Sequence, residues 1–256
     1  MEKRNLGKTD IKLTSIGFGG APLGNLFEEL NETDCFDIVK SCFENNINLY
    51  DTSPLYGYGL SEHRIGNFIK TIDPKSYYLS TKVGRYLTPE RNYYKDGKFK
   101  GHINFIPHFD YSYDGVMRSF DQSIHRLAVP EIDICLIHDV DRYTFGNEVD
   151  HYFKIAMNGA YKALNDLKEQ KVIKSIGVGL NDADICARFA NEGDFDCMLL
   201  AGRYTLLDQT ALDDFFPIAE KNNIGIILGG VFNSGILAKG IGCLLYTSPS
   251  PRDLAR

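Results

Sequence analysis

The fold of this 256-residue chain is decided by a stretch that begins with IDICLIH at residues 132–138 and ends with KSIGVGL at residues 174–180. Both runs are apolar on successive residues, which is typical of parallel strands that are covered on both faces. Between them, an apolar stripe repeats at helical spacing and comprises Ala156, Ala160, Leu164 and Leu167. A buried strand, a helix and a second buried strand predict a β-α-β unit.

Similar units lie on both sides of this stretch. Their apolar runs are SIGFGG (15–20), NINLYDTS (46–53), YYLSTKV (77–83), DCMLLAG (196–202) and GIILGG (225–230). Helical stripes begin at Phe36, Val116 and Leu212, and Ser112 is the expected N-cap of the second. Segment 4–17 has the pattern of a β-hairpin that leads into the first strand.

Two architectures suit this alternation: a doubly wound open sheet and a (β/α)8 TIM barrel. The segment GFGGAPLG (17–24) begins like a dinucleotide-binding fingerprint, but Pro22 stands where the third glycine should be. Seven strand-helix units fit a barrel, which typically takes about 250 residues. We therefore predict an α/β barrel that is truncated after its seventh strand.

The C-terminal segment CLLYTSPSPRDLAR (243–256) has no strand or helix periodicity. Residues Cys243 to Asp253 can be back-translated into the end of a transposase-based sequencing-library adaptor. We therefore interpret residues 243–256 as an artefactual tail and residues 1–242 as the barrel domain. The natural protein is expected to continue with an eighth strand.

Composition and charge exclude several classes of partner. The net charge is −6 and no basic run is present, so nucleic acid is not an expected partner. No apolar run reaches the roughly 18 residues of a membrane helix, and the charged start MEKRNLGKTD is not a signal peptide. The six cysteines contain no Cys-x-x-Cys pair, which favours reduced thiols in a cytoplasmic protein and predicts no metal site. The oligomeric state cannot be read from the sequence.

Titratable residues follow the predicted strands where a barrel places its active site, at the carboxyl ends. Asp51 ends the second run, Tyr56 lies in the next loop, Lys82 lies in the third run and His138 ends the fourth. Each of them alone has a structural explanation, such as a helix cap, a turn or a solvated strand end. Together, four titratable residues at one rim predict an active site.

These four residues suit proton transfer to or from a carbonyl oxygen. A phenol with a pKa of about 10 exchanges protons slowly near neutrality, and a nearby ammonium lowers that pKa. Lys82 is expected to lower the pKa of Tyr56, Asp51 to hold Lys82 charged, and a neutral His138 to donate a hydrogen bond to the substrate oxygen. Because no side chain is a hydride source, the chemistry implies a nicotinamide cofactor.

The motifs resemble those of the aldo-keto reductase superfamily. The resemblance runs through LGKTDIKLTSIGFGG, DTSPLYGYGLSEHRIG, STKVG, LIHDVD, SIGVGLND and GGVFNSGIL, across residues 4–240. It implies a barrel with the catalytic tetrad Asp51, Tyr56, Lys82 and His138, in which Tyr56 is the general acid or base. It also implies that the cofactor lies extended across the strand ends.

The resemblance further implies a set of cofactor-binding residues. They are Gly20, Ala21, Asp51, Asn181, Gly230, Val231, Phe232 and Asn233. The chain departs from the superfamily at two usual contacts: Ala201 replaces a glutamine, and Gly229 replaces an aromatic residue that stacks on the nicotinamide. Phe232 is a candidate substitute for that aromatic residue. The choice between NAD and NADP depends on a segment after the eighth strand and cannot be read.

The segments IHDVDRYTFGNE and LLAGRYTLLDQ resemble those of the aldose 1-dehydrogenases. This resemblance implies oxidation of a small sugar such as L-fucose, D-arabinose or galactose at C1 to the lactone. Two alternatives remain: a pyridoxal 4-dehydrogenase or general aldehyde or ketone reductase, and a non-catalytic nicotinamide-binding subunit.

The long connection 84–112 is rich in aromatic residues and follows the third predicted strand. Its aromatic faces either bind a sugar or pyridine ring or form a self-packed flap. Asp139, Asp141 and Arg142 follow His138 directly. They either bind sugar hydroxyls or serve the start of the next helix.

Overall fold

A computed structural model describes residues 1–91 and 97–239 of the chain, so the predicted tail 243–256 lies outside the described residues. Seven parallel strands form a nearly closed barrel, in the order β11-β10-β9-β8-β5-β4-β3. These strands are β3 (Phe18–Gly19), β4 (Leu49–Asp51), β5 (Tyr78–Val83), β8 (Ile134–His138), β9 (Ser175–Leu180), β10 (Cys197–Ala201) and β11 (Gly225–Gly229). Each lies within one of the seven predicted runs, so the predicted strand pattern is confirmed.

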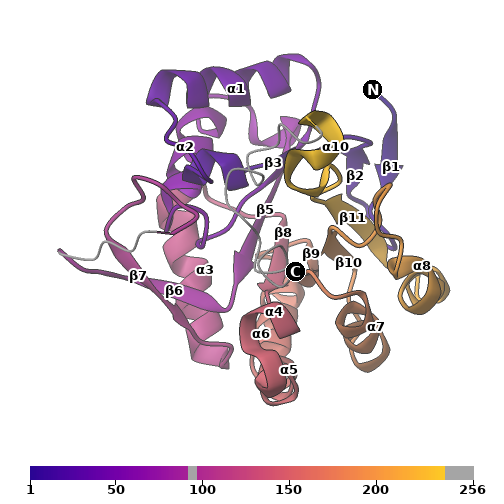
Figure 1. The fold of residues 1–256 in the computed structure, drawn as a ribbon. Helices are drawn as coiled ribbons and strands as arrows, with labels where there is room; N and C mark the ends of the chain where they lie inside the picture. Colours follow the sequence, from indigo (N-terminus) through magenta and orange to yellow (C-terminus); the bar gives the residue numbers. More distant parts are fainter. Residues whose placement is uncertain (92–96, 240–256) are drawn as a thin grey trace, which may run out of the picture.

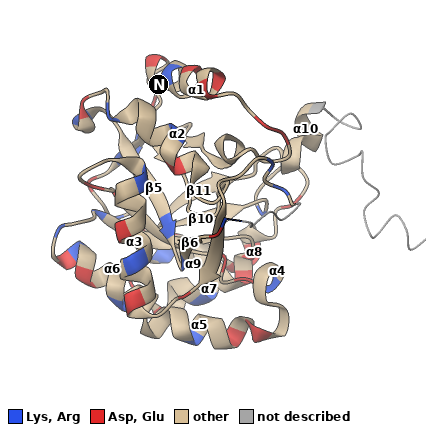
Figure 2. Ribbon diagram, turned by 90° about the vertical axis from the view of Figure 1, so that its left-hand side faces the viewer, with Lys and Arg blue, Asp and Glu red and all other residues tan. Residues whose placement is uncertain are grey.

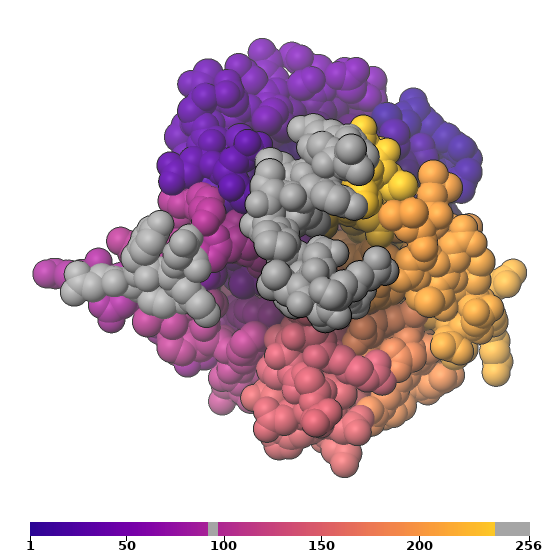
Figure 3. Space-filling view, in the orientation of Figure 1, coloured from indigo at the N-terminus to yellow at the C-terminus, as the bar shows by residue number. Residues whose placement is uncertain are grey.

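The helices lie outside the strands, and successive segments follow one another around the molecule (Figures 1 and 3). The longer ones are α1 (Glu32–Glu44), α2 (Leu60–Ile69), α3 (Tyr113–Leu127), α5 (Val149–Asn158), α6 (Ala160–Glu169), α7 (Ala183–Glu192) and α9 (Phe216–Lys221). The shorter ones are η1 (Ala21–Gly24), η2 (Pro74–Ser76), α4 (Arg142–Phe145), η3 (Gly146–Glu148), α8 (Ala211–Asp214), η4 (Asn233–Gly235) and α10 (Ile236–Lys239). As predicted, the Ser112 side chain caps α3 by accepting a hydrogen bond from the Gly115 amide.

The stripe from Ala156 to Leu167 is divided between two helices, α5 and α6, with Gly159 between them. At residue 159 the chain passes so close to the start of α3 that a Cβ atom would lie 2.4 Å from the carbonyl oxygen of Tyr111. Only glycine fits there. Apolar periodicity cannot show such a break, because both helices continue the same buried face.

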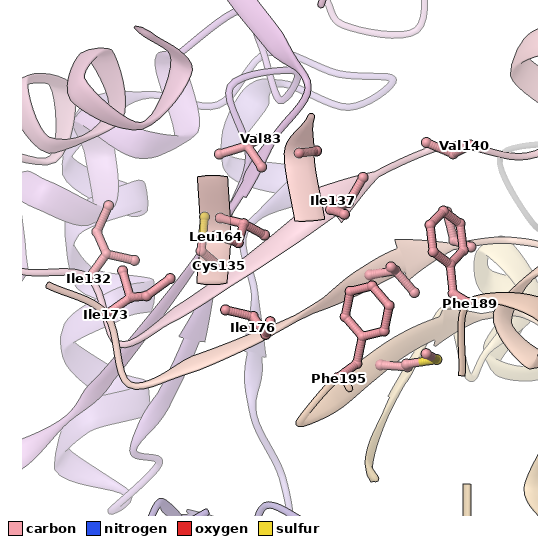
Figure 4. Packing of buried hydrophobic residues seen from close by; sticks show 14 of the residues in the cluster. Val83, Ile132, Cys135, Ile137, Val140, Leu164, Ile173, Ile176, Phe189 and Phe195 are labelled. Atoms are coloured by element: carbon pink, nitrogen blue, oxygen red, sulfur yellow. The ribbon is translucent and has the colours of Figure 1, made fainter. Parts of the chain in front are cut away.

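Alternation along the strands separates two buried apolar clusters. In β8, Cys135 and Ile137 belong to the large cluster between the strands and the helices, which Figure 4 shows from close by. Ile134 and Leu136 belong to a smaller cluster. The same alternation places His138 on the face of Ile134 and Leu136, toward the barrel interior.

The predicted N-terminal hairpin is present as β1 (Lys3–Asn5) paired antiparallel with β2 (Lys12–Thr14). Its Leu6, Ile11 and Leu13 join the smaller apolar cluster together with Leu49, the first residue of β4. The hairpin therefore packs at the amino ends of the strands, opposite the rim where the titratable residues lie.

The connection 84–112 contains a second hairpin, formed by β6 (Arg85–Pro89) and β7 (Phe105–Phe109). The Gln122 side chain of α3 accepts a hydrogen bond from the Leu87 amide and donates one to its carbonyl. The hairpin is therefore held against α3. The aromatic residues Tyr93 and Tyr94 lie outside the described residues.

Most Lys, Arg, Asp and Glu residues lie on the outer helices and loops, whereas the central strands carry few of them (Figure 2). Among the described residues, no helix is long and apolar enough to cross a membrane.

Candidate active site

Three of the four predicted catalytic residues lie on neighbouring strands. Asp51 is the last residue of β4, His138 is the last residue of β8, and Lys82 lies next to the end of β5 between them. These strands are paired in the order β4-β5-β8. The three side chains therefore converge at the carboxyl rim of the barrel, and the Lys82 side chain is only 1% exposed.

Lys82 and Asp51 form a buried ion pair, with 2.7 Å between Lys82 Nζ and Asp51 Oδ2. The ammonium also donates to the Thr52 carbonyl oxygen at 2.7 Å, and Ser80 Oγ donates to Asp51 Oδ1 at 2.8 Å. Burial alone lowers the pKa of Lys82, but the negative charge of Asp51 and contact with Tyr56 outweigh it, so the pKa lies above the ordinary value. Lys82 is therefore a permanent cation at neutral pH.

Gly179 leaves room for Lys82 on the facing strand β9. A Cβ atom at residue 179 would lie 3.3 Å from Cε of Lys82 and 3.5 Å from its Cδ. The lysine side chain thus runs across the barrel interior through space that a larger residue would take.

Tyr56 returns to this rim through a tight turn. Its amide donates to the Ser53 carbonyl, and Gly57 and Gly59 have φ angles of +64° and +97°, which favour glycine. Gly24 of η1 packs directly on this turn, since a Cβ atom there would lie 2.5 Å from the Tyr56 carbonyl carbon. The turn is thereby held in one position.

The Tyr56 ring lies between the lysine and the histidine. Lys82 Nζ is 4.9 Å from the ring centroid, and the His138 ring meets it edge-on with 6.0 Å between centroids. All four predicted residues are thus in one cluster.

The pKa of Tyr56 differs from the sequence-based expectation. Burial raises the pKa of the phenol more than the Lys82 ammonium lowers it, and the charges of Asp51 and Asp139 add to the rise. Lys82 does lower the pKa of Tyr56, as expected, but the expected net decrease of that pKa was wrong. The sequence shows which charge lies near the phenol and does not show how completely the phenol is removed from water.

His138 is buried and neutral at the same rim. Burial holds its pKa well below the ordinary value, and the positive charges of Arg85, Lys82 and Lys98 lower it further. Ring nitrogen Nδ1 lies 3.1 Å from Ser53 Oγ, and Nε2 lies 3.4 Å from Asp139 Oδ1. A neutral imidazole in this position can donate one hydrogen bond to a substrate oxygen.

The connection 84–112 supplies a wall beside the cluster. Phe99 is buried, and its ring centroid lies 6.2 Å from that of Tyr56. Arg85 forms an ion pair with Asp139 at 2.9 Å, and its guanidinium stacks 4.4 Å above the Phe109 ring. Arg85 Nη1 is buried and makes no hydrogen bond within the described structure. The surroundings of the tetrad are therefore aromatic and cationic.

Asp139, Asp141 and Arg142 follow His138, and the sequence left open whether they bind substrate or serve the start of the next helix. Asp141 caps α4 by accepting from the Thr144 amide, and its second oxygen accepts from Asn181 Nδ2 at 2.8 Å. Arg142 pairs with Asp184 at the surface. Asp139 turns back toward His138 with a φ angle of +51°. Of the three, only Asp139 contacts the tetrad.

The predicted cofactor-binding residues lie along the same rim. Gly20 and Ala21 directly follow β3, Asn181 directly follows β9, and Gly230, Val231, Phe232 and Asn233 directly follow β11. Gly229 and Ala201 end the paired strands β11 and β10.

These residues fit an extended nucleotide. The side-chain oxygen of Asn233 is buried and has no hydrogen-bond partner within the described structure, so it can accept from a bound group. The side-chain nitrogen of Asn181 donates a hydrogen bond to Asp141 Oδ2. Its side-chain oxygen can therefore accept a hydrogen bond from the carboxamide of a nicotinamide. Phe232 is 60% exposed.

Sequence reasoning did not identify Ser53, Gly24, Gly179 or Arg85 as parts of the site. Only Gly179 had a local signal, because a strand that reads Gly-Val-Gly leaves unfilled space on one face. Among the described residues, no group of three or more His, Cys, Asp or Glu side chains is placed to hold a metal ion.

Comparisons with known proteins agree with the barrel fold. Residues 15–242 match the model of the aldo/keto reductase family. The chain is 41% identical to a pyridoxal 4-dehydrogenase from Microbacterium luteolum, over 93% of this chain and 72% of that protein. It is 33% identical to a D-threo-aldose 1-dehydrogenase from a Pseudomonas species, over 90% and 69%. The solved aldo-keto reductase AKR11C1 from Bacillus halodurans shares the fold with a TM-score of 0.70 at 22% identity, over 93% and 69%.

Proposed function

Because this chain belongs to the aldo/keto reductase family and is an NAD(P)-dependent oxidoreductase, we propose that it oxidises a cyclic hemiacetal to a lactone. The observation that carries the proposal is the cluster of a phenol, a permanent ammonium and a neutral imidazole at one barrel rim. Such a cluster transfers one proton at one oxygen, which is the protein's share of a hydride transfer.

The substrates in the names of the two relatives described above can both form a cyclic hemiacetal. An aldose in its ring form is a hemiacetal at C1. Pyridoxal has an aldehyde next to a hydroxymethyl group, and the two close into a hemiacetal ring. In either case, loss of a hydride from the hemiacetal carbon and of a proton from its hydroxyl gives a lactone.

We assign Tyr56 the role of general base toward the hemiacetal hydroxyl. The Lys82 ammonium favours the phenolate, because it offsets part of the rise that burial causes in the pKa of Tyr56. Asp51 holds Lys82 in place, and neutral His138 donates a hydrogen bond to the same substrate oxygen. In the reverse direction Tyr56 returns the proton.

The cofactor, when bound, supplies the hydride acceptor. Gly20, Ala21, Asp51, Asn181 and Phe232 are proposed to hold its nicotinamide end, and Gly230, Val231 and Asn233 its phosphate and ribose groups. Both NAD and NADP remain candidates.

Two substrates within the hemiacetal class are proposed. An aldose of the L-fucose, D-arabinose or galactose type is the first, as the motifs after His138 indicate. Pyridoxal is the second, because the relative with that substrate in its name is 41% identical. The aromatic and cationic wall of Phe99, Phe109 and Arg85 also suits a planar ring with an acidic phenol.

The test is an absorbance assay for the reduced nicotinamide. The purified protein is mixed with NAD or NADP and with L-fucose, D-arabinose, D-galactose or pyridoxal. Turnover of any of these with a lactone as product supports the proposal, and the relative kcat/KM values choose between sugar and pyridoxal. If only open-chain aldehydes or ketones are converted, in the reductive direction, the protein is a general reductase.

A non-catalytic nicotinamide-binding subunit is the remaining alternative. It predicts cofactor binding without turnover of any hemiacetal, aldehyde or ketone, and Tyr56→Phe would then change nothing measurable.

A further inference from the structure

The two ring nitrogens of His138 face two different oxygen atoms. Nδ1 lies 3.1 Å from the hydroxyl of Ser53, and Nε2 lies 3.4 Å from the carboxyl oxygen Oδ1 of Asp139. A neutral imidazole carries one proton, so two tautomers compete. The neighbours of each nitrogen decide which of them is the lower in free energy.

On the Nδ1 side, Ser53 is fully buried and its Oγ already accepts a hydrogen bond from the Leu55 amide at 3.1 Å. If the imidazole proton is on Nε2, the Ser53 hydroxyl donates to Nδ1 and every polar atom at this contact has a partner. If the proton is on Nδ1, Ser53 Oγ accepts twice. Its own hydrogen then has no acceptor among the described residues, and a buried donor without an acceptor is unfavourable.

On the Nε2 side, the Asp139 carboxyl group leads to the same tautomer. Burial raises the pKa of this carboxyl group, whereas Arg85, whose Nη2 donates to Oδ2 at 2.9 Å, lowers that pKa and favours the ionised carboxylate. Nε2 lies close to the carboxylate without a hydrogen bond to it, and a protonated Nε2 is attracted by that negative charge, whereas an unprotonated Nε2 would bring its lone pair close to it. The competing arrangement therefore requires a protonated Asp139 as well as an unsatisfied Ser53.

We propose that Ser53 is a positioning residue that fixes His138 as the Nε2–H tautomer, with its proton directed at the oxygen of the reacting carbon. Ser53 sets the hydrogen-bonding state of the group that contacts the substrate and does not itself contact it. The Nε2 atom lies 3.4 Å from Asp139 Oδ1 without a hydrogen bond to it in the described structure, so its proton is available to the substrate oxygen. The kinetic consequence rests on the proposed function, whereas the tautomer does not.

The experiment is 15N NMR of the protein with labelled histidine, in which protonated and unprotonated ring nitrogens have well-separated shifts. The chain has six histidines, and His138→Gln assigns the signal of interest. We expect wild-type His138 to be protonated at Nε2 alone at neutral pH. Ser53→Ala should give a mixture of tautomers, and Ser53→Thr, which keeps the hydroxyl, should restore the single form.

The kinetic arm compares Ser53→Ala with Ser175→Ala. Ser175 is also fully buried, but it lies at the opposite end of its strand and its hydroxyl faces Cys197. We expect kcat/KM to fall about tenfold in Ser53→Ala, which corresponds to about 1.4 kcal/mol, with unchanged cofactor affinity. Ser175→Ala should retain wild-type kcat/KM, and Ser53→Thr should recover most of the loss.

Two results would overturn the proposal. One is a wild-type spectrum with the proton on Nδ1, which decides the matter even if Ser53→Ala fails to fold. The other is a Ser53→Ala protein that keeps both the single Nε2–H form and the wild-type kcat/KM. Failure of the hemiacetal proposal would look different, because turnover would be absent while the wild-type spectrum still showed the Nε2–H form.

Discussion

Replacing Lys82 by methionine tests whether the ion pair with Asp51 serves stability, catalysis or both. At 2.7 Å and an effective dielectric constant of about 20, the attraction between the two charges is about 6 kcal/mol. The cost of removing both groups from water offsets most of this attraction. The net value of the pair is therefore small, but the cost of breaking it is not.

Lys82→Met leaves the Asp51 carboxylate buried without a counter-charge, with Ser80 as its side-chain donor. We expect a loss of about 3–5 kcal/mol in unfolding free energy. For a chain of this size, that loss corresponds to a Tm roughly 10 °C lower. Because the cation beside Tyr56 is also removed, kcat/KM should fall by at least about 100-fold.

The double variant Asp51→Asn/Lys82→Met separates the two effects. It removes both charges, so most of the lost stability should return, while kcat/KM should stay low because the phenol still lacks its cation. Thermal unfolding and steady-state kinetics of wild type, the two single variants and the double variant complete a double-mutant cycle. A double variant as unstable as Lys82→Met would show that the unpaired Asp51 charge is not the source of the instability. A double variant that regains activity would show that Tyr56 does not need the cation.

Three further predictions concern the same rim. Tyr56→Phe should lower kcat/KM by about 10²- to 10⁴-fold without changing cofactor affinity, whereas Tyr58→Phe should leave kcat/KM nearly unchanged. Equal losses in the two variants would contradict the assignment of Tyr56 as the general acid or base. Gly24→Ala should shift the Tyr56 turn, because the added Cβ would lie 2.5 Å from the Tyr56 carbonyl carbon. We expect this shift to lower kcat/KM by about 100-fold. Wild-type kinetics in this variant would show that the turn adapts to the added methyl group. The pKa of His138 lies well below the ordinary 6.5, so at low pH the folded protein binds fewer protons at this residue than the unfolded chain, and stability should be lost as pH falls below about 6.5. Urea unfolding at several pH values should show a smaller loss of unfolding free energy in His138→Gln than in wild type. Equal pH dependence in the two proteins would refute the lowered pKa.

Much of the fold could be predicted because its strands are short, apolar and separated by helical stripes. IDICLIH and KSIGVGL could be assigned as buried strands from composition alone, and the ends of the predicted strands located Asp51, Lys82 and His138. What could not be predicted depends on contacts between distant segments. The break at Gly159 follows from the approach of the Tyr111 backbone, which no local pattern reports.

The same limit applies to the site. Tyr56 could be predicted because its turn is marked by proline and glycine. Ser53 could not, because its role depends on His138, 85 residues later in the chain. The pKa of Tyr56 also lay beyond the sequence, since its direction depends on how far burial outweighs the charge of Lys82.

The contact between Lys82 and Gly179 has a consequence for protein engineering. Replacing glycine by alanine within a strand is a usual way to raise stability, since it reduces the freedom of the unfolded chain. At residue 179 the added methyl group would lie 3.3 Å from Cε of Lys82, so the lysine side chain would have to move by a few tenths of an ångström. At residue 179 the usual gain in stability is therefore set against a displacement of the catalytic cation, so a stabilising substitution there would be judged by kcat/KM as well as by Tm.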